Sequence, residues 1–202
     1  MKSIKIVLLI FIFFSSCNNQ NSARKSEVIN EDAGRRKDGL APFLSKFKIL
    51  PNEVLKLNFD GYDTSLTKLD AGSDDTLFIP NCAMGLAYGM LADTSKFYAL
   101  LWYAGVEDGA LELTILDKNG NPIDERQPTT GLYGSDCGYY WFGKVFIRKD
   151  MTILSRDSIV TFNCDSGVPP ETFWKHELDS MDGSINQYGK IIFGKVRQTK
   201  LD

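Results

Sequence analysis

The chain has 202 residues, of which 23 are basic and 26 acidic, giving a formal net charge of −3 at pH 7. The acidic excess lies after residue 39, where the chain has 16 basic and 22 acidic residues. Because nucleic-acid binding depends on neutralising phosphates with basic side chains, this balance argues against a nucleic-acid partner. With 43% hydrophobic residues, the 163 residues from Leu40 onward are enough for one domain with a real core.

The N-terminus has the pattern of a targeting segment. Two lysines precede an apolar run over residues 6–14, and Ser15-Ser16-Cys17 follows it. The run is shorter than the about 20 apolar residues that a helix needs to cross a bilayer. It resembles the signal peptide and lipobox of bacterial lipoproteins, with Phe14 in place of the usual leucine. The resemblance implies removal of residues 1–16, lipidation of Cys17 and attachment to a membrane through that lipid.

Residues 17–39 contain only scattered apolar side chains among several charged ones. Such a segment buries too little surface to offset the entropy lost on ordering. It therefore predicts a flexible, lipid-anchored tether. The folded part is expected to be a single β-rich domain over residues 40–202.

The apolar pattern of this domain has a period near two rather than 3.6. Alternation is visible in 54–59, 111–115 and 190–196, while 98–103 is apolar on both faces, as in a central strand. Turn residues recur every 8 to 15 positions. The pattern predicts an all-β antiparallel meander that forms a single β-sandwich or barrel-like domain. We expect at most one short helical turn, in 86–91 or 42–47.

One hairpin stands out within this pattern. Residues 111–117 and 122–127 flank a turn that contains Asn119-Gly120. This dipeptide supplies the positive φ angles that a tight hairpin turn requires. Pro122 has no amide donor and therefore belongs at the start of a strand or on a sheet edge.

Four cysteines need separate assignments. Cys17 is the lipidation candidate, which leaves Cys82, Cys137 and Cys164 in the domain. No C-x-x-C spacing is present, so neither a thioredoxin-type centre nor a zinc site is supported. Outside the cytoplasm one disulfide and one odd thiol are allowed, whereas three buried free thiols are the alternative.

The disulfide prediction depends on the register of two neighbouring strands, 139–148 and 153–162. A four-residue loop between them places Arg148 opposite Ile153 and, by the same register, Cys137 opposite Cys164. A two-residue loop instead makes the two cysteines diagonal neighbours, too far apart for easy bridging.

Catalytic patterns are weak in this sequence. His176 is the single histidine and no Gly-x-Ser-x-Gly motif occurs. The single histidine also argues against a histidine-based zinc site, because zinc needs several nitrogen or sulfur ligands. The segment 117–121 faintly resembles a calcium loop, but its glycine comes two places early. We therefore predict no catalytic residue, metal or cofactor. A pair of carboxylates for glycoside hydrolysis stays open because only their separation in space decides that chemistry.

Aromatic residues give the one positive indication of binding. They are grouped on predicted strands, where an exposed face could stack against a sugar, although aromatic residues also fill sandwich cores. The candidate platform residues are Trp102, Tyr103, Tyr139, Tyr140, Trp141 and Trp174.

Together, the Cys17 signal and the segments 77–80, 98–103 and 113–124 resemble a family of small lipoproteins of Bacteroidota with a β-rich body. The resemblance implies a lipid anchor at Cys17 and no particular activity. The residues after Cys17 lack the acidic run that resembles a surface-export signal in this phylum. This favours the periplasmic face of the outer membrane over the cell surface.

We therefore expect a lipid-anchored envelope protein whose non-catalytic β-domain binds a ligand, such as a glycan, or a protein partner. The first alternative is an accessory lipoprotein that docks on another envelope protein without a small-molecule site. The second alternative is a carboxylate-dependent hydrolase.

Overall fold

The computed structural model describes residues 32, 34–51, 65–82, 84–105, 110–130, 135–136, 138–162 and 173–201. The chain divides into two compact units, Met1–Gly34 and Arg35–Asp202, and every strand belongs to the second. Cys17, Cys137 and Cys164 lie outside the described residues. No helix in the described part of the chain is long and apolar enough to cross a bilayer.

The first sheet, sheet A, has the strand order β1-β3-β4-β5-β6, with β2 also paired to β3. Its pairs are antiparallel apart from β1 with β3, which is parallel. The strands are β1 (Ile49–Leu50), β2 (Thr67–Lys68), β3 (Leu86–Leu91), β4 (Tyr98–Ala104), β5 (Ala110–Leu116) and β6 (Pro122–Arg126).

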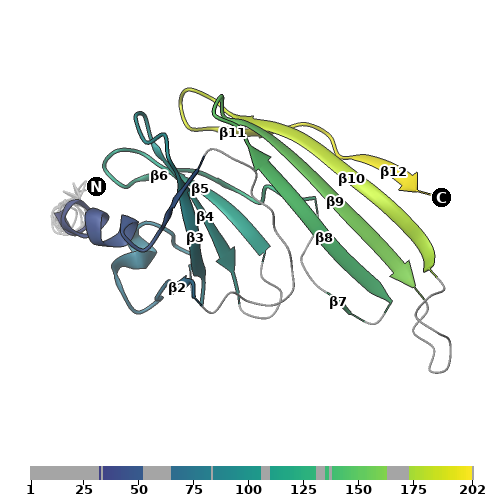
Figure 1. Cartoon of the computed structure of the whole chain (residues 1–202). Helices are drawn as coiled ribbons and strands as arrows, with labels where there is room; N and C mark the ends of the chain where they lie inside the picture. The colour runs from purple at the N-terminus through teal and green to yellow at the C-terminus, as the bar shows by residue number, and fades with distance from the viewer. Residues whose placement is uncertain are drawn as a thin grey trace, which may run out of the picture. The chain divides into compact units, whose positions relative to one another are not determined.

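The second sheet, sheet B, has the order β11-β10-β9-β8-β7, with β12 also paired to β10, and all its pairs are antiparallel. The strands are β7 (Ser135–Asp136), β8 (Tyr139–Ile147), β9 (Thr152–Phe162), β10 (Phe173–Ile185), β11 (Ile191–Phe193) and β12 (Arg197–Leu201). The predicted β-rich class is confirmed. The two sheets do not close into a barrel, so the barrel-like alternative is wrong (Figure 1).

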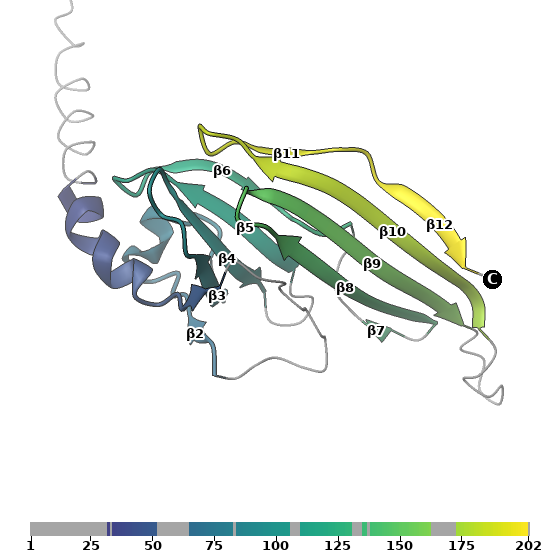
Figure 2. The same ribbon diagram turned by 45° about the horizontal axis from the view of Figure 1, so that its top comes forward.

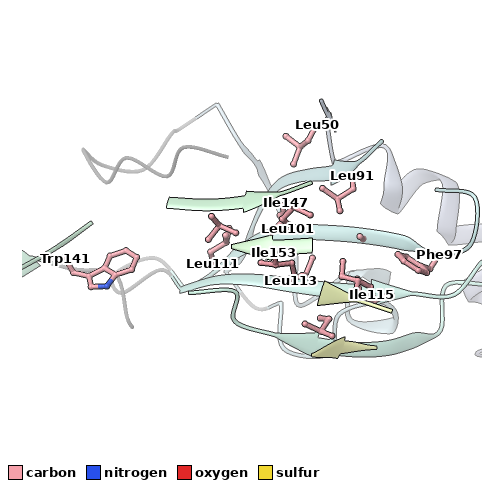
Figure 3. Close-up of a cluster of buried hydrophobic side chains, with 14 residues drawn as sticks. Leu50, Leu91, Phe97, Leu101, Leu111, Leu113, Ile115, Trp141, Ile147 and Ile153 are labelled. Carbon is pink, nitrogen blue, oxygen red and sulfur yellow. The ribbon is translucent and has the colours of Figure 1, made fainter. Parts of the chain in front are cut away.

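The main core lies between the two sheets. Period-two alternation places Leu101 and Leu113 of sheet A on one face and Ile147 and Ile153 of sheet B on the face opposite, and all four are buried (Figure 3). Trp141 belongs to the same cluster but lies away from these four, at its end. The arrangement is a sandwich whose core is built from alternate residues of each strand.

A third layer covers the other face of sheet A (Figure 2). It contains a helix over residues 34–44 and the short 3₁₀ helix η1 (Asp74–Leu77). The rings of Phe43 and Phe78 stack there with centroids 4.5 Å apart. This helix starts inside the predicted tether, and 86–91, where a helical turn was an alternative, is strand β3. Sheet A is therefore buried on both faces, which explains why β4 is apolar on both sides.

The predicted hairpin over 111–127 is confirmed as β5 and β6. Gly120 has φ of 82°, and Pro122 is the first residue of the edge strand β6. A Cβ at Gly120 would lie 2.8 Å from the Phe78 ring, so the turn also needs glycine for packing against the third layer.

The β8–β9 hairpin has the predicted strands but a different register. Ile147, rather than Arg148, lies opposite Ile153, because the connection contains three residues, Lys149 to Met151. Met151 adopts φ of 64°, as expected for the last residue of a three-residue hairpin loop. The predicted pairing of Arg148 with Ile153 is therefore wrong by one residue. The Cys137–Cys164 disulfide itself stays a prediction.

Candidate functional site

Three connections between strands line a cavity of about 190 Å³ that is partly open to solvent. They are the β3–β4 connection, the β8–β9 loop and the β10–β11 turn, so both sheets contribute to its wall. The lining residues are Asp93, Ser95, Lys96, Phe97, Asp150, Met151, Ile185, Asn186 and Gln187.

The apolar part of the cavity wall is continuous with the main core. Phe97 and Ile185 are buried, and Met151 packs against the same cluster. Met151 is held on both sides, because its amide donates to Arg148 O at 2.9 Å and its carbonyl accepts from the Ile185 amide at 3.0 Å. A positive φ is unfavourable for a side chain that is not glycine, and such strain persists where the surrounding structure imposes it. The cavity therefore has a strained but fixed residue in its wall.

The polar part contains two carboxylates that are held in place by their own loops. Asp93 Oδ1 accepts from the Ser95 amide at 3.0 Å, and Asp150 Oδ1 accepts from the Thr152 hydroxyl at 2.7 Å. Hydrogen bonds from Ser95 lower the pKa of Asp93, and hydrogen bonds from Thr152 lower the pKa of Asp150. Both groups are therefore anionic at neutral pH, and Lys96 adds a cation to the same rim.

The β10–β11 turn is ordered by Asn186. Its Oδ1 accepts from the amides of Tyr188 and Lys190 at 2.9 and 3.0 Å, and its own amide donates to Lys190 O. The turn contains Gly189 with φ of 77°. Each turn in the cavity wall is thus held by its own hydrogen bonds. The wall has apolar groups on one side and charged or amide groups on the other.

Of the six residues of the predicted aromatic platform, the structure describes the side chains of three, Trp102, Tyr103 and Trp141. Trp102 and Trp141 are 1% and 3% exposed and lie in different core clusters, so neither ring offers a face to solvent. Tyr103 is half-buried and packs edge-on against Tyr88. Tyr139 and Tyr140 lie in β8 and Trp174 lies in β10, and their side chains fall outside the described ones. Of the three whose side chains are described, none lines the cavity.

Of the cysteines, only Cys82 is described. It is a free thiol in the core beneath the third layer, and burial, reinforced by the charge of Asp75, raises its pKa to about 11. A thiol in this state is a poor nucleophile and metal ligand.

A polar relay that the sequence did not indicate crosses the third-layer side of sheet A. Trp102 Nε1 donates to Thr114 Oγ1 at 2.9 Å, and Thr114 donates to Glu125 Oε2 at 2.8 Å. Burial and the nearby Glu125 charge raise the pKa of Glu112 to about 7. The sequence indicates only that residues 112 and 114, two positions apart on one strand, lie on the same face of the sheet. Trp102, directly opposite Glu112, lies on that face as well. Neither Glu112 nor Glu125 lines the cavity.

A second pair of acids lies inside the sandwich. Asp157 and Asp179 are directly opposite each other on β9 and β10, and both are buried. Asp157 Oδ2 accepts from the Thr130 amide at 2.6 Å and from Ser155 Oγ at 3.1 Å. Oδ1 of each acid has no hydrogen-bond partner among the described residues. Burial, followed by the Asp179 charge, raises the pKa of Asp157 against these hydrogen bonds.

His176 hydrogen-bonds with one serine. Its Nε2 lies 2.7 Å from Ser158 Oγ on the neighbouring strand. A nucleophilic serine also needs an acid that orients the histidine and a site for the developing oxyanion. Among the described residues, none supplies such an acid to His176. The described residues also contain no group of three or more His, Cys, Asp or Glu side chains that could hold a metal ion.

Comparisons with protein-family models, with curated proteins and with solved structures found no match for this chain.

Proposed function

We propose that this chain is a lipid-anchored envelope protein whose β-domain binds a small hydroxylated ligand, a single sugar unit or a similar polyol, in the cavity between the three connections. The cavity itself carries the proposal, because it combines an apolar wall with a rim of fixed charges and amides. Ligand sites typically pair apolar surface with a few well-placed polar groups. The anchor is supported by the Cys17 signal segment.

The size and chemistry of the cavity select the ligand class. Its volume of about 190 Å³ is below the about 300–1,000 Å³ of sites for drug-sized molecules, so the ligand must be smaller. A sugar presents hydroxyl groups at its edge and C–H groups on its face. Asp93 and Asp150 can accept from hydroxyls, Lys96 can donate to them, and the C–H face can pack on Met151 and Ile185.

The experiment is a binding screen with the full lipidated chain, purified in detergent and titrated with neutral, acidic and N-acetylated monosaccharides. We expect at least one sugar to raise the thermal unfolding midpoint in a saturable way, because a ligand that binds only the folded state stabilises it. Asp150→Asn and Lys96→Ala should weaken this response, whereas Lys68→Ala, an exposed change on β2, should not. A response that is equal in all four proteins, or no response to any sugar, would contradict the proposal.

The anchor is tested separately. Mass spectrometry of the membrane-extracted protein should show an acylated N-terminal peptide that begins at Cys17. In Cys17→Ser this peptide should be absent and residues 1–16 retained. An unmodified Cys17 in the wild-type protein would refute the anchor and leave the cavity proposal standing.

A further inference from the structure

Sheet B has one face that nothing in the described part of the chain covers. Alternate residues of β8 to β10, such as Trp141, Val145 and Ile153, point into the core and are buried. The residues between them point outward, and none whose side chain is described is buried. In both views no described helix or strand lies on this side of sheet B (Figures 1 and 2). We call it the outer face.

A row of cations crosses the outer face. Lys144 of β8 lies directly opposite Arg156 of β9, Arg156 lies opposite Ser180 of β10, and Ser180 lies opposite Arg197 of β12. Arg197 forms an ion pair with Asp182. Lys144 and Arg156 form no ion pair with any described residue. Like charges directly opposite each other destabilise a sheet, so this pair points to a requirement other than folding.

Apolar side chains flank the row on both sides. Phe142, which is 48% exposed, and Leu178 lie in one neighbouring row, and Phe146 and Leu154 lie in the other. Ile192 of β11 is 55% exposed at one end of the same face. Exposed apolar surface of this kind, interrupted by charges, marks an interaction site rather than an ordinary solvated sheet.

The charge of this face is opposite to that of the domain. Among the described paired residues of β8 to β12, those in outward register are basic at Lys144, Arg156 and Arg197 and acidic at Asp182 alone. The domain from residue 40 carries six more acidic than basic groups. The outer face is therefore a basic area on an acidic body, and its complement is an anionic surface.

We infer that the outer face of sheet B lies on an anionic phospholipid bilayer. Lipid phosphates complement Lys144 and Arg156, and the headgroup region accepts the flanking aromatic and aliphatic side chains. The outer face is an open sheet, and its breadth suits a broad, flat surface better than a single peptide. The inference rests on the proposed lipid anchor at Cys17, which keeps the domain beside a membrane. One acyl signal and one basic surface together give firmer attachment than either alone.

The test separates the face from the anchor. Residues 18–202 are produced without Cys17, so the polypeptide carries no lipid yet keeps the compact unit Arg35–Asp202 and every described residue. A cooperative thermal transition shared with the full-length protein verifies its fold. The polypeptide is then sedimented with vesicles of phosphatidylcholine, with or without about 30% phosphatidylglycerol. We expect binding to the anionic vesicles that weakens as salt is raised.

Lys144→Ala with Arg156→Ala should lower the partition coefficient at least about tenfold, since each basic residue near an anionic surface contributes roughly fivefold. Phe142→Ser should also lower it. Lys37→Ala with Lys68→Ala removes the same charge from exposed positions in the helix and β2 and should leave binding unchanged. All three variants alter exposed side chains, so thermal midpoints should stay close to that of the parent.

Three results would overturn the inference. They are no binding to anionic vesicles, equal binding to both vesicle types, and equal loss in the Lys144/Arg156 and Lys37/Lys68 variants. Capture of an acidic protein through Lys144 and Arg156, with vesicles ignored, would likewise reject the lipid surface in favour of a protein partner. None of these results depends on whether Cys17 is acylated or whether the cavity binds a sugar.

Discussion

Glu112 should make the stability of the domain depend on pH near neutrality. Its pKa is raised from 4.5 to about 7, first by burial and then by the charge of Glu125. The folded state therefore favours the protonated acid. This contribution to stability is complete below about pH 4.5 and is lost as the pH rises from there to about 7.

The magnitude follows from the same change. A rise from 4.5 to about 7 corresponds to at most about 3 kcal/mol between the two protonation states. Because the Glu112 side chain is only partly buried, solvent screening reduces the expected effect to about 1–2 kcal/mol. Glu112→Gln removes the ionisation while keeping size and shape. It should therefore stabilise the domain by about 1–2 kcal/mol at pH 8 and have little effect at pH 4.

The assay is urea unfolding of the parent and Glu112→Gln proteins at both pH values, since the difference between the proteins cancels the titration of other groups. Glu125→Gln is the matched control. This substitution removes the Glu125 charge, which is one of the two causes of the raised Glu112 pKa. An NMR titration of Glu125→Gln should therefore find the Glu112 pKa closer to 4.5. The reasoning is refuted if Glu112→Gln has the same effect at pH 4 and pH 8, or if the Glu112 carboxyl titrates near 4.5 in the parent protein.

Three further substitutions test the packing and the buried polar groups. Thr114→Val removes the acceptor of a buried indole N–H and should cost about 1–3 kcal/mol in urea unfolding, whereas Thr114→Ser, which keeps the hydroxyl, should cost less. Gly120→Ala should destabilise more than Gly105→Ala, because both have positive φ but only the first Cβ would contact Phe78, at 2.8 Å; equal unfolding midpoints would contradict this. Asp157→Asn should raise the thermal unfolding midpoint at pH 8 and not at pH 4. The reason is that burial raises the Asp157 pKa, so the folded state loses stability as this carboxyl ionises. A lower midpoint of Asp157→Asn at pH 8 would show that the hydrogen bonds to the Asp157 carboxylate outweigh its burial.

Local sequence signals predicted those parts of the fold that depend on local chemistry. Asn119-Gly120 set the β5–β6 turn, and the doubly apolar run over 98–103 identified the central strand. The predicted helical turn at 42–47 overlaps only the end of the helix over 34–44, and the rest of the helix was missed because Gly34 and Gly39 are poor helix formers. Its stability comes from tertiary contacts such as the stack of Phe43 on Phe78, which no local pattern shows.

The candidate site was harder to predict for a physical reason. Asp93, Asp150 and Asn186 belong to turns that are far apart in the sequence, and only the packing of the two sheets brings them together. Each resembles an ordinary solvated turn residue when seen alone. The one-residue error in the β8–β9 register had a similar origin, because nothing in the sequence marks Met151 for a positive φ that glycine usually adopts.

The most direct test of the central claim is an NMR titration of the ¹³C-methyl-labelled protein with the monosaccharide that gives the largest thermal shift. If the sugar binds in the cavity, the Met151 and Ile185 methyl signals should shift saturably with the same dissociation constant, while Met181, buried elsewhere in sheet B, should not respond. A titration that leaves Met151 and Ile185 unperturbed, or that shifts only methyl groups remote from the cavity, would contradict the account.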